Sequence, residues 1–126
     1  MSGGAWEYVA AYVNNGNSSL SNGQSLVNGA AKTKNVYSKG SSDSRDNNYS
    51  ANSGKYGDAV YETSANGNSS NSSWYGDCSY FPHTSNPFFK RGGNCNNGTV
   101  AGVFCFYDYY GGSDSYDSFR PVLVAL

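Results

Sequence analysis

The sequence predicts an α+β domain that is mostly β and rich in loops, and three observations carry this prediction. Short apolar or aromatic blocks, Met1–Tyr8, Phe88–Gly93 and Ser118–Leu123, occur in order and are separated by Gly/Asn/Ser-rich sequence. The 126 residues fit one domain. The 12 Tyr, 6 Phe and 2 Trp can each bury a large area, so aromatic rings replace the scarce aliphatic residues in the core. We therefore expect residues 1–126 to form a single domain with a small aromatic core.

The first half of the chain predicts one strand and one short helix. Trp6–Val13 is an apolar and aromatic run that is typical of a buried strand. After a turn-rich loop, Gln24–Tyr37 has loose helical spacing and predicts a short helix, which Gly29 weakens. Ser38–Gly54 is polar and has no hydrophobic periodicity, so we expect a long surface loop there.

The second half predicts three further strands. Asp58–Thr63 fits either a short strand or a helical turn, and Trp74–Phe81 is aromatic and irregular. Phe88–Arg91 predicts a strand that ends at two glycines. Val100–Tyr107 predicts the next strand, with Val100 to Phe104 buried, and Phe119–Leu126 predicts the last.

Composition excludes several classes of protein. The net charge of −1 argues against nucleic-acid binding, which needs a basic patch. No stretch is long and apolar enough to insert into a membrane. Met1 is followed by Ser-Gly-Gly rather than by a basic and then apolar run, so an export signal, if the protein works outside the cell, is not in this chain.

The three cysteines, Cys78, Cys95 and Cys105, fit one disulfide and one free thiol, and the sequence leaves their pairing open. A zinc site is not expected, because the chain has no Cys-x-x-Cys pair and its single histidine is His83. Asp and Asn oxygens could hold Ca²⁺, although no Asp-x-Asp-x-Asp-Gly loop is present, so no cofactor is expected except this one candidate.

The three blocks resemble the formylglycine-generating-enzyme (sulfatase-modifying-factor) family, a branch of the C-type lectin-like fold. The first block matches the family pattern at Met1, Gly3, Trp6 and Glu7, the second at Arg-Gly-Gly (91–93), and the third at Phe-Arg (119–120). The resemblance spans almost the whole chain. Because it starts at a Met that is internal in the family, it implies that the family's N-terminal strand and helices are missing here. It also implies that Glu7 and Arg120 form a buried structural ion pair.

The same fold is used by the variable proteins of diversity-generating retroelements in phages and bacteria, in which adenines of Asn codons are mutated. Every residue from Asn94 to Asp117 is reachable from such a codon, and the stretch has no Lys, Glu, Gln, Met or Trp. The resemblance therefore implies that residues 94–117 are a variable binding segment. An ordinary Gly/Tyr/Asn loop is the competing interpretation.

The composition of this segment favours ligand binding, because Tyr supplies rigid contact area while Ser, Gly and Asn adapt their hydrogen bonds. We expect an adhesin or receptor-binding module on a cell surface, phage tail or other appendage, whose partner is a protein or glycan. An enzyme of the formylglycine-generating type that uses Cys95 or Cys105 is the alternative, although the family's cysteine position falls on Asn97. A pilin or tail-fibre head subunit is the third. The predicted ligand-binding residues are Asn94, Cys95, Asn96, Asn97, Cys105, Tyr107, Asp108, Tyr109, Tyr110, Ser113, Asp114, Tyr116 and Asp117, bordered by Trp74 and Tyr75.

Overall fold

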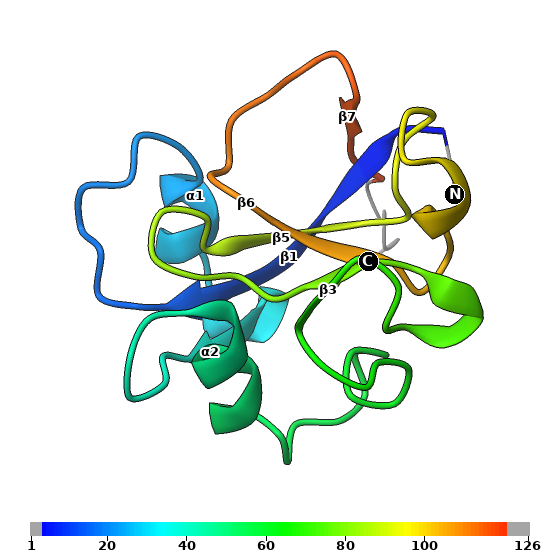
Figure 1. The fold of residues 1–126 in the computed structure, drawn as a ribbon. Helices are drawn as coiled ribbons and strands as arrows, with labels where there is room; N and C mark the ends of the chain where they lie inside the picture. Colours follow the sequence, from blue (N-terminus) through cyan, green and yellow to red (C-terminus); the bar gives the residue numbers. More distant parts are fainter. Residues whose placement is uncertain (1–3, 121–126) are drawn as a thin grey trace.

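The computed structural model describes residues 4–120, which form a curled, mostly β sheet with short helices and long loops (Figure 1). The sheet has the order β2-β1-β5-β6-β4-β3 across the described residues, and β7 pairs with β1. The predicted α+β, mostly β and loop-rich class is confirmed at this level. The strands are β1 (Trp6–Asn14), β2 (Asn35–Ser38), β3 (Asn68–Ser69), β4 (Ser79–Tyr80), β5 (Phe88–Arg91), β6 (Phe106–Tyr109) and β7 (Asp117–Ser118). The helices are α1 (Gln24–Asn28) and α2 (Arg45–Ala51), with 3-10 turns η1 (Ala31–Thr33), η2 (Trp74–Gly76) and η3 (Gly98–Val100).

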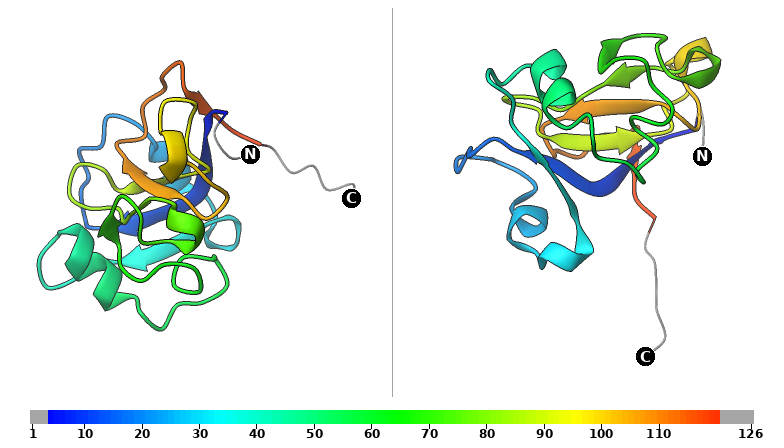
Figure 2. Two further views of the ribbon diagram at one scale, coloured as in Figure 1. Left: turned by 45° about the vertical axis from the view of Figure 1, so that its right-hand side comes forward. Right: turned by 90° about the horizontal axis from the view of Figure 1, so that it is seen from below.

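Strand β1 organises the sheet, as its apolar sequence predicts. It pairs antiparallel with β5, and the register shifts between Tyr8 and Tyr12. Its C-terminal half pairs parallel with β2, and Trp6 and Glu7 at its start pair parallel with β7. Helices α1 and α2 lie on opposite sides of β1 (Figure 2). One long strand thus pairs with β2, β5 and β7, which come from different parts of the chain.

The core is aromatic, as the composition predicts. Tyr37 packs between Phe81, at 5.3 Å between ring centroids, and Phe89, at 5.1 Å. Phe81 and Phe89 meet edge to face at 5.2 Å, an arrangement that aromatic rings prefer. These three rings, with Phe106 and Val13, are at most 2% exposed. They form a packed layer against which the surface loops are held.

The segment 38–54 is not the long surface loop that the sequence predicts, because it contains α2. Ser44 caps this helix by accepting a hydrogen bond from the Asn47 amide at 3.4 Å. The buried face of α2 is polar: Asn48 is fully buried and its amide donates to Asp43 Oδ1 and to the Pro82 carbonyl, at 2.7 and 3.0 Å. A helix that is buried through asparagine side chains leaves no apolar periodicity, which is why the pattern misses it.

Three other boundaries differ from the sequence predictions. The helix predicted in 24–37 ends at Asn28, and the remainder forms η1 and β2. The strand predicted over 100–107 is wrong over most of its length: β6 starts at Phe106, and Val103 is 64% exposed. Of the two alternatives for residues 58–63, a short strand or a helical turn, the strand is not found, and these residues form bends and turns.

The C-terminal block also differs. The last strand of the described residues is β7, Asp117–Ser118, and Phe119 and Arg120 are not in a strand. The rest of the predicted strand, residues 121–126, lies outside the described part of the chain. Arg120 does pair with Glu7, at 2.6 Å, but its side chain is 65% exposed, so the predicted burial of this pair is wrong. The Arg120 guanidinium lowers the pKa of Glu7.

Candidate functional site

The predicted segment 94–117 runs from the end of β5 through η3, β6 and a long loop into β7 (Figure 1). Its side chains are exposed to different degrees, and exposure decides which of them a ligand can touch. Cys95, Asn96, Tyr110, Ser113, Asp114 and Tyr116 are exposed, Asn97, Tyr107, Tyr109 and Asp117 are half-buried, and Asn94, Cys105 and Asp108 are buried.

The two bordering aromatic residues do meet this segment. Trp74 and Tyr75 pack on Phe104, at ring-centroid distances of 5.4 and 6.3 Å, with the Tyr75 ring nearly parallel to it. Trp74 is 58% exposed, Tyr75 is 91% exposed, and the neighbouring Val103 is 64% exposed. We call Trp74, Tyr75, Val103 and Phe104 the aromatic surface. Large exposed apolar side chains that adjoin one another are typical of interaction sites.

The backbone at Tyr75 is what brings its ring into solvent. Tyr75 has φ 63° and ψ 15°, in the left-handed region that residues other than glycine seldom occupy. The flanking turn is fixed by hydrogen bonds from the Gly76 amide to the Ser73 carbonyl and from the Trp74 amide to the Thr63 carbonyl, at 3.0 and 2.9 Å. Strain of this kind persists where the surroundings hold it, and it concentrates at functional positions.

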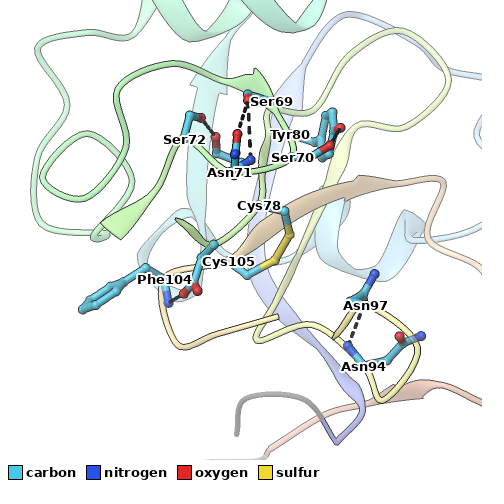
Figure 3. The surroundings of a disulfide bond; sticks show 12 residues. Ser69, Ser70, Asn71, Ser72, Cys78, Tyr80, Asn94, Asn97, Phe104 and Cys105 are labelled. Carbon is cyan, nitrogen blue, oxygen red and sulfur yellow. Dashed lines mark hydrogen bonds between the residues drawn. A yellow bond between two sulfur atoms is a disulfide. The ribbon is translucent and has the colours of Figure 1, made fainter. Parts of the chain in front are cut away.

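A disulfide joins Cys78 to Cys105, the residue that follows Phe104 of the aromatic surface (Figure 3). Both cysteines are at most 2% exposed, and the Phe104 ring extends away from them. The backbone is joined here as well, because the Phe106 amide donates to the Cys78 carbonyl at 3.1 Å. The disulfide therefore ties the turn that carries Phe104 to the segment that carries Trp74 and Tyr75. It also settles the cysteine pairing that the sequence leaves open.

Asp77 adds a second support. Its side chain is buried, and Oδ2 accepts a hydrogen bond from the Phe104 amide at 2.9 Å. The carboxylate occupies the space beside Gly102, where a Cβ would come within 2.0 Å of Asp77 Oδ1. Position 102 thus requires glycine, because any Cβ there would clash with the Asp77 carboxylate. The result is a turn whose position is fixed from below while its apolar side chains face outward.

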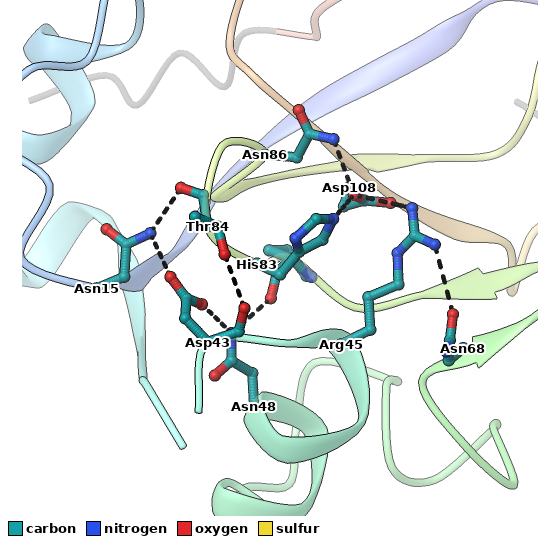
Figure 4. Close-up of polar contacts among 10 residues, drawn as sticks. Asn15, Asp43, Arg45, Asn48, Asn68, His83, Thr84, Asn86 and Asp108 are labelled. Carbon is teal, nitrogen blue, oxygen red and sulfur yellow. Dashed lines mark hydrogen bonds and ion pairs between the residues drawn. The ribbon is translucent and has the colours of Figure 1, made fainter. Parts of the chain in front are cut away.

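At the centre of the segment, Asp108 holds β6 to α2 and is not part of the surface. Its fully buried carboxylate receives both hydrogen bonds from Arg45 Nη2, at 2.9 and 3.1 Å (Figure 4). His83 Nε2 lies 3.0 Å from Oδ2, and Asn86 donates to the same oxygen at 3.1 Å. A charge-assisted contact in which one guanidinium nitrogen donates to both carboxylate oxygens positions both partners. The role that this geometry supports for Asp108 is structural.

The loop after β6 carries the remaining predicted residues. The Asp114 carboxylate accepts hydrogen bonds from the Tyr116 amide and the Tyr109 hydroxyl, at 2.6 and 3.2 Å. Burial, together with this bond, raises the pKa of Tyr109 to about 12. Tyr110 and Tyr116 are 44% and 40% exposed. This loop therefore presents tyrosine edges and polar groups at the end of β6 opposite to the disulfide.

Cys105 is joined to Cys78 and is not a free thiol, whereas Cys95 is free and exposed. His83 contacts Asp108 rather than a cysteine. Among residues 4–120, no group of three or more His, Cys, Asp or Glu side chains is arranged to hold a metal ion. Within the same range, no helix has the length and apolar character needed to cross a bilayer.

Two features of the site escape the sequence analysis. Val103 and Phe104 resemble strand residues, yet they belong to the aromatic surface. Lys90 is not singled out, although a lysine inside the apolar block Phe-Phe-Lys-Arg is a signal, because lysine is seldom fully buried. It is 2% exposed and pairs with Asp117.

Comparison of the chain with protein-family models, with curated proteins and with solved structures finds no match.

Proposed function

We propose that this protein is a ligand-binding module of the adhesin or receptor-binding kind, which contacts a protein or glycan through the aromatic surface and the exposed residues of segment 94–117. The observation that carries the proposal is the aromatic surface itself. Trp74 and Tyr75 expose most of their area although Phe104, the disulfide and Asp77 hold them in place. Rigid aromatic anchors lose little entropy on binding, and they dominate the energetics of many interfaces.

The resemblance to C-type lectin-like variable proteins supports the same proposal from the sequence side. We propose that segment 94–117 diversifies, and that the exposed positions change while buried ones such as Gly102, Phe106 and Asp108 stay fixed. The disulfide is consistent with an extracellular protein, because disulfides persist in oxidising compartments. A cell surface or a virion is the proposed location, and a phage tail or surface appendage is the proposed carrier.

The binding proposal is tested with wild type and two single variants on a glycan array and on intact bacterial cells. Trp74→Ala should reduce binding at least tenfold, because truncating a central aromatic anchor costs about 1.4 kcal/mol of binding free energy and often more. Tyr56→Ala, which removes an aromatic ring that is 68% exposed elsewhere on the molecule, should leave binding unchanged. Equal loss in both variants, or self-association as the only binding, would favour a structural subunit. Repeating the assay with Ca²⁺ and with a chelator tests the calcium expectation.

The diversification proposal is tested by sequencing this gene codon by codon across many cells of one population. Substitutions should gather between Asn94 and Asp117 at adenines of a near-identical template copy, and should favour exposed positions such as Asn96, Tyr110 and Ser113. If this stretch is as invariant as Trp6, the segment does not diversify. The enzyme alternative is tested by iodoacetamide alkylation of Cys95 across pH, where ordinary thiol behaviour counts against it.

A further inference from the structure

A buried ion pair joins Lys90 of β5 to Asp117 of β7, at the end of the long loop of the segment. Lys90 Nζ is 2.7 Å from Asp117 Oδ1, and the two side chains are 3% and 6% exposed. The ammonium also lies 3.4 Å from the centroid of the Tyr109 ring, and 5.4 and 5.7 Å from those of Trp6 and Tyr8. The carboxylate and the three rings therefore stabilise a charge that is almost completely removed from water.

The other carboxylate oxygen of this pair has no partner. Asp117 Oδ2 is buried and makes no hydrogen bond within the described residues. A buried carboxylate oxygen without a donor is unfavourable, and native structures seldom keep one unless a further group reaches it. Tyr8 does not fill this role, because its hydroxyl donates to the Gly112 carbonyl at 2.5 Å.

Asp117 lines a cavity of about 400 Å³ between the start of β1 and the loop, together with Tyr8, Gly111, Gly112 and Phe119. A second cavity of about 600 Å³, lined mainly by apolar groups that include Leu26 and Phe88, shares Tyr8, Gly111 and Phe119 with the first. We call the two together the Asp117 groove. One part of the groove is apolar, and Asp117, whose unpartnered Oδ2 is buried below the surface, is among the residues that line the other part.

We propose that the Asp117 groove is a binding site for an uncharged amphipathic group: an apolar ring or chain that carries a single O–H or N–H donor, such as a phenol. The apolar body lies along Tyr8, Leu26 and Phe119, and the donor reaches Asp117 Oδ2. Because that oxygen lies below the surface, the proposal requires Gly111 and Gly112, which line the groove, to move slightly when the donor reaches it.

The charge balance of the groove selects an uncharged donor. Lys90 already neutralises Asp117, so a cationic ligand at Oδ2 would bring a second positive charge close to the buried ammonium. An anionic ligand would meet Asp117 and the nearby Asp114. A neutral hydroxyl or N–H instead completes the hydrogen bonding of Oδ2 and leaves the net charge of the site at zero.

The test is an NMR titration of the full chain with p-cresol and, as its matched control, 4-methylanisole, which has nearly the same shape but no donor. We expect p-cresol to shift the amide signals of Gly111, Gly112 and Ser118 and to bind about tenfold more tightly than 4-methylanisole, because one hydrogen bond to a charged acceptor is worth at least that factor. Equal affinity of the two probes, or p-cresol shifts that are absent from the groove, would overturn the proposal.

The variant that checks the donor contact replaces both charges together, Lys90→Met with Asp117→Leu, because removing one would strand the other in the interior. This double variant should still bind both probes, but with equal affinity. If p-cresol keeps its advantage, Asp117 is not the acceptor. The outcome is independent of the aromatic surface, since Trp74→Ala should leave p-cresol binding unchanged, so this proposal and the proposed function can fail separately.

Discussion

At the scale of single residues, Tyr75 has a conformation that costs stability, and the proposed function gives a reason for it. Its ring is 91% exposed and contributes little burial, while its φ of 63° places a bulky side chain in the left-handed region. Such a conformation costs about 1–2 kcal/mol for an L-residue with a Cβ. Among the described residues, the ring contact that Tyr75 makes in return is the nearly parallel one with Phe104, with 6.3 Å between ring centroids.

The residue-scale prediction is that Tyr75→Gly leaves the free energy of unfolding unchanged or raises it by up to about 1 kcal/mol, because glycine relieves the left-handed strain. Binding through the aromatic surface should fall in the same variant. Urea unfolding followed by circular dichroism measures the first effect. The control is Tyr56→Gly, at an exposed position without positive φ, which should lower stability. A clear loss of stability in Tyr75→Gly would show that the ring stabilises the fold.

At the scale of elements, the side chains of β6 alternate between a buried face and a partly exposed face. Phe106 and Asp108 are buried, whereas Tyr107 and Tyr109 are half-buried on the other face. Asp108 reaches α2 through Arg45, and also joins the turn that carries His83. A polar contact thus fixes the strand that lies between the exposed loops of segment 94–117.

We predict that Asp108→Asn destabilises the protein by about 3–5 kcal/mol, because it removes the charge that Arg45 and its neighbours surround and leaves the guanidinium without its buried partner. Asp46→Asn, on the exposed side of the same helix, should change stability by less than about 0.5 kcal/mol. Denaturant unfolding of the two variants measures the difference. Similar small effects in both would mean that Arg45 is solvated rather than held by Asp108.

The elements that the sequence predicts correctly are those that bury apolar residues in a continuous run. Strands β1 and β5 are found where the apolar sequence places them. Helix α2 is missed because its fully buried side chain, Asn48, and its buried C-cap residue, Asn52, are both polar. Strand β6 starts later than predicted because a disulfide and the Gly102 contact turn the chain at Phe104, and neither constraint is visible in hydrophobicity.

The candidate site was predictable to a similar extent. Trp74 and Tyr75 stand out as aromatic residues in polar surroundings, and they adjoin segment 94–117 as expected. The burial of Cys105 and Asp108 depends on partners that are distant in sequence, 27 residues away for the disulfide. Pattern analysis of one sequence cannot supply such pairings, so it also cannot separate exposed from buried positions within the segment.

For the whole molecule, the Cys78–Cys105 disulfide is the one covalent link between distant segments of the described chain. It closes a loop of 27 residues, for which the chain-entropy model gives about 3.5 kcal/mol of stabilisation. We predict that Cys78→Ala with Cys105→Ala lowers the free energy of unfolding by about 2–4 kcal/mol and weakens binding at the aromatic surface. Cys95→Ser should change neither, since Cys95 is exposed and free. Denaturant unfolding and the binding assay together measure both effects.

The many buried and half-buried tyrosines make the stability of the whole fold sensitive to high pH. Burial raises the pKa of Tyr37, with a further contribution from its hydrogen bond to Asp58, and burial raises the pKa of Tyr8 and Tyr61 as well. In the unfolded chain these groups ionise near pH 10. Above that pH the unfolded chain releases protons that the folded chain retains, so unfolding becomes more favourable as pH rises. Stability from these groups is therefore complete below about pH 10 and is lost progressively above it.

Tyr37 gives the sharpest test of this link between tyrosine ionisation and stability, because it is only 1% exposed. It should contribute a loss of about 1.4 kcal/mol per pH unit above pH 10, whereas Tyr8 and Tyr61, which are more exposed, should contribute less. We predict that urea unfolding between about pH 8 and about pH 11 shows constant stability and then a fall, and that Tyr37→Phe makes the fall shallower by about that slope while lowering stability at neutral pH through loss of the Asp58 bond. Both proteins should carry Cys95→Ser, because a thiolate at high pH can attack the disulfide. Parallel pH profiles for the two proteins would show that Tyr37 ionises without unfolding, and that the aromatic core admits a buried phenolate.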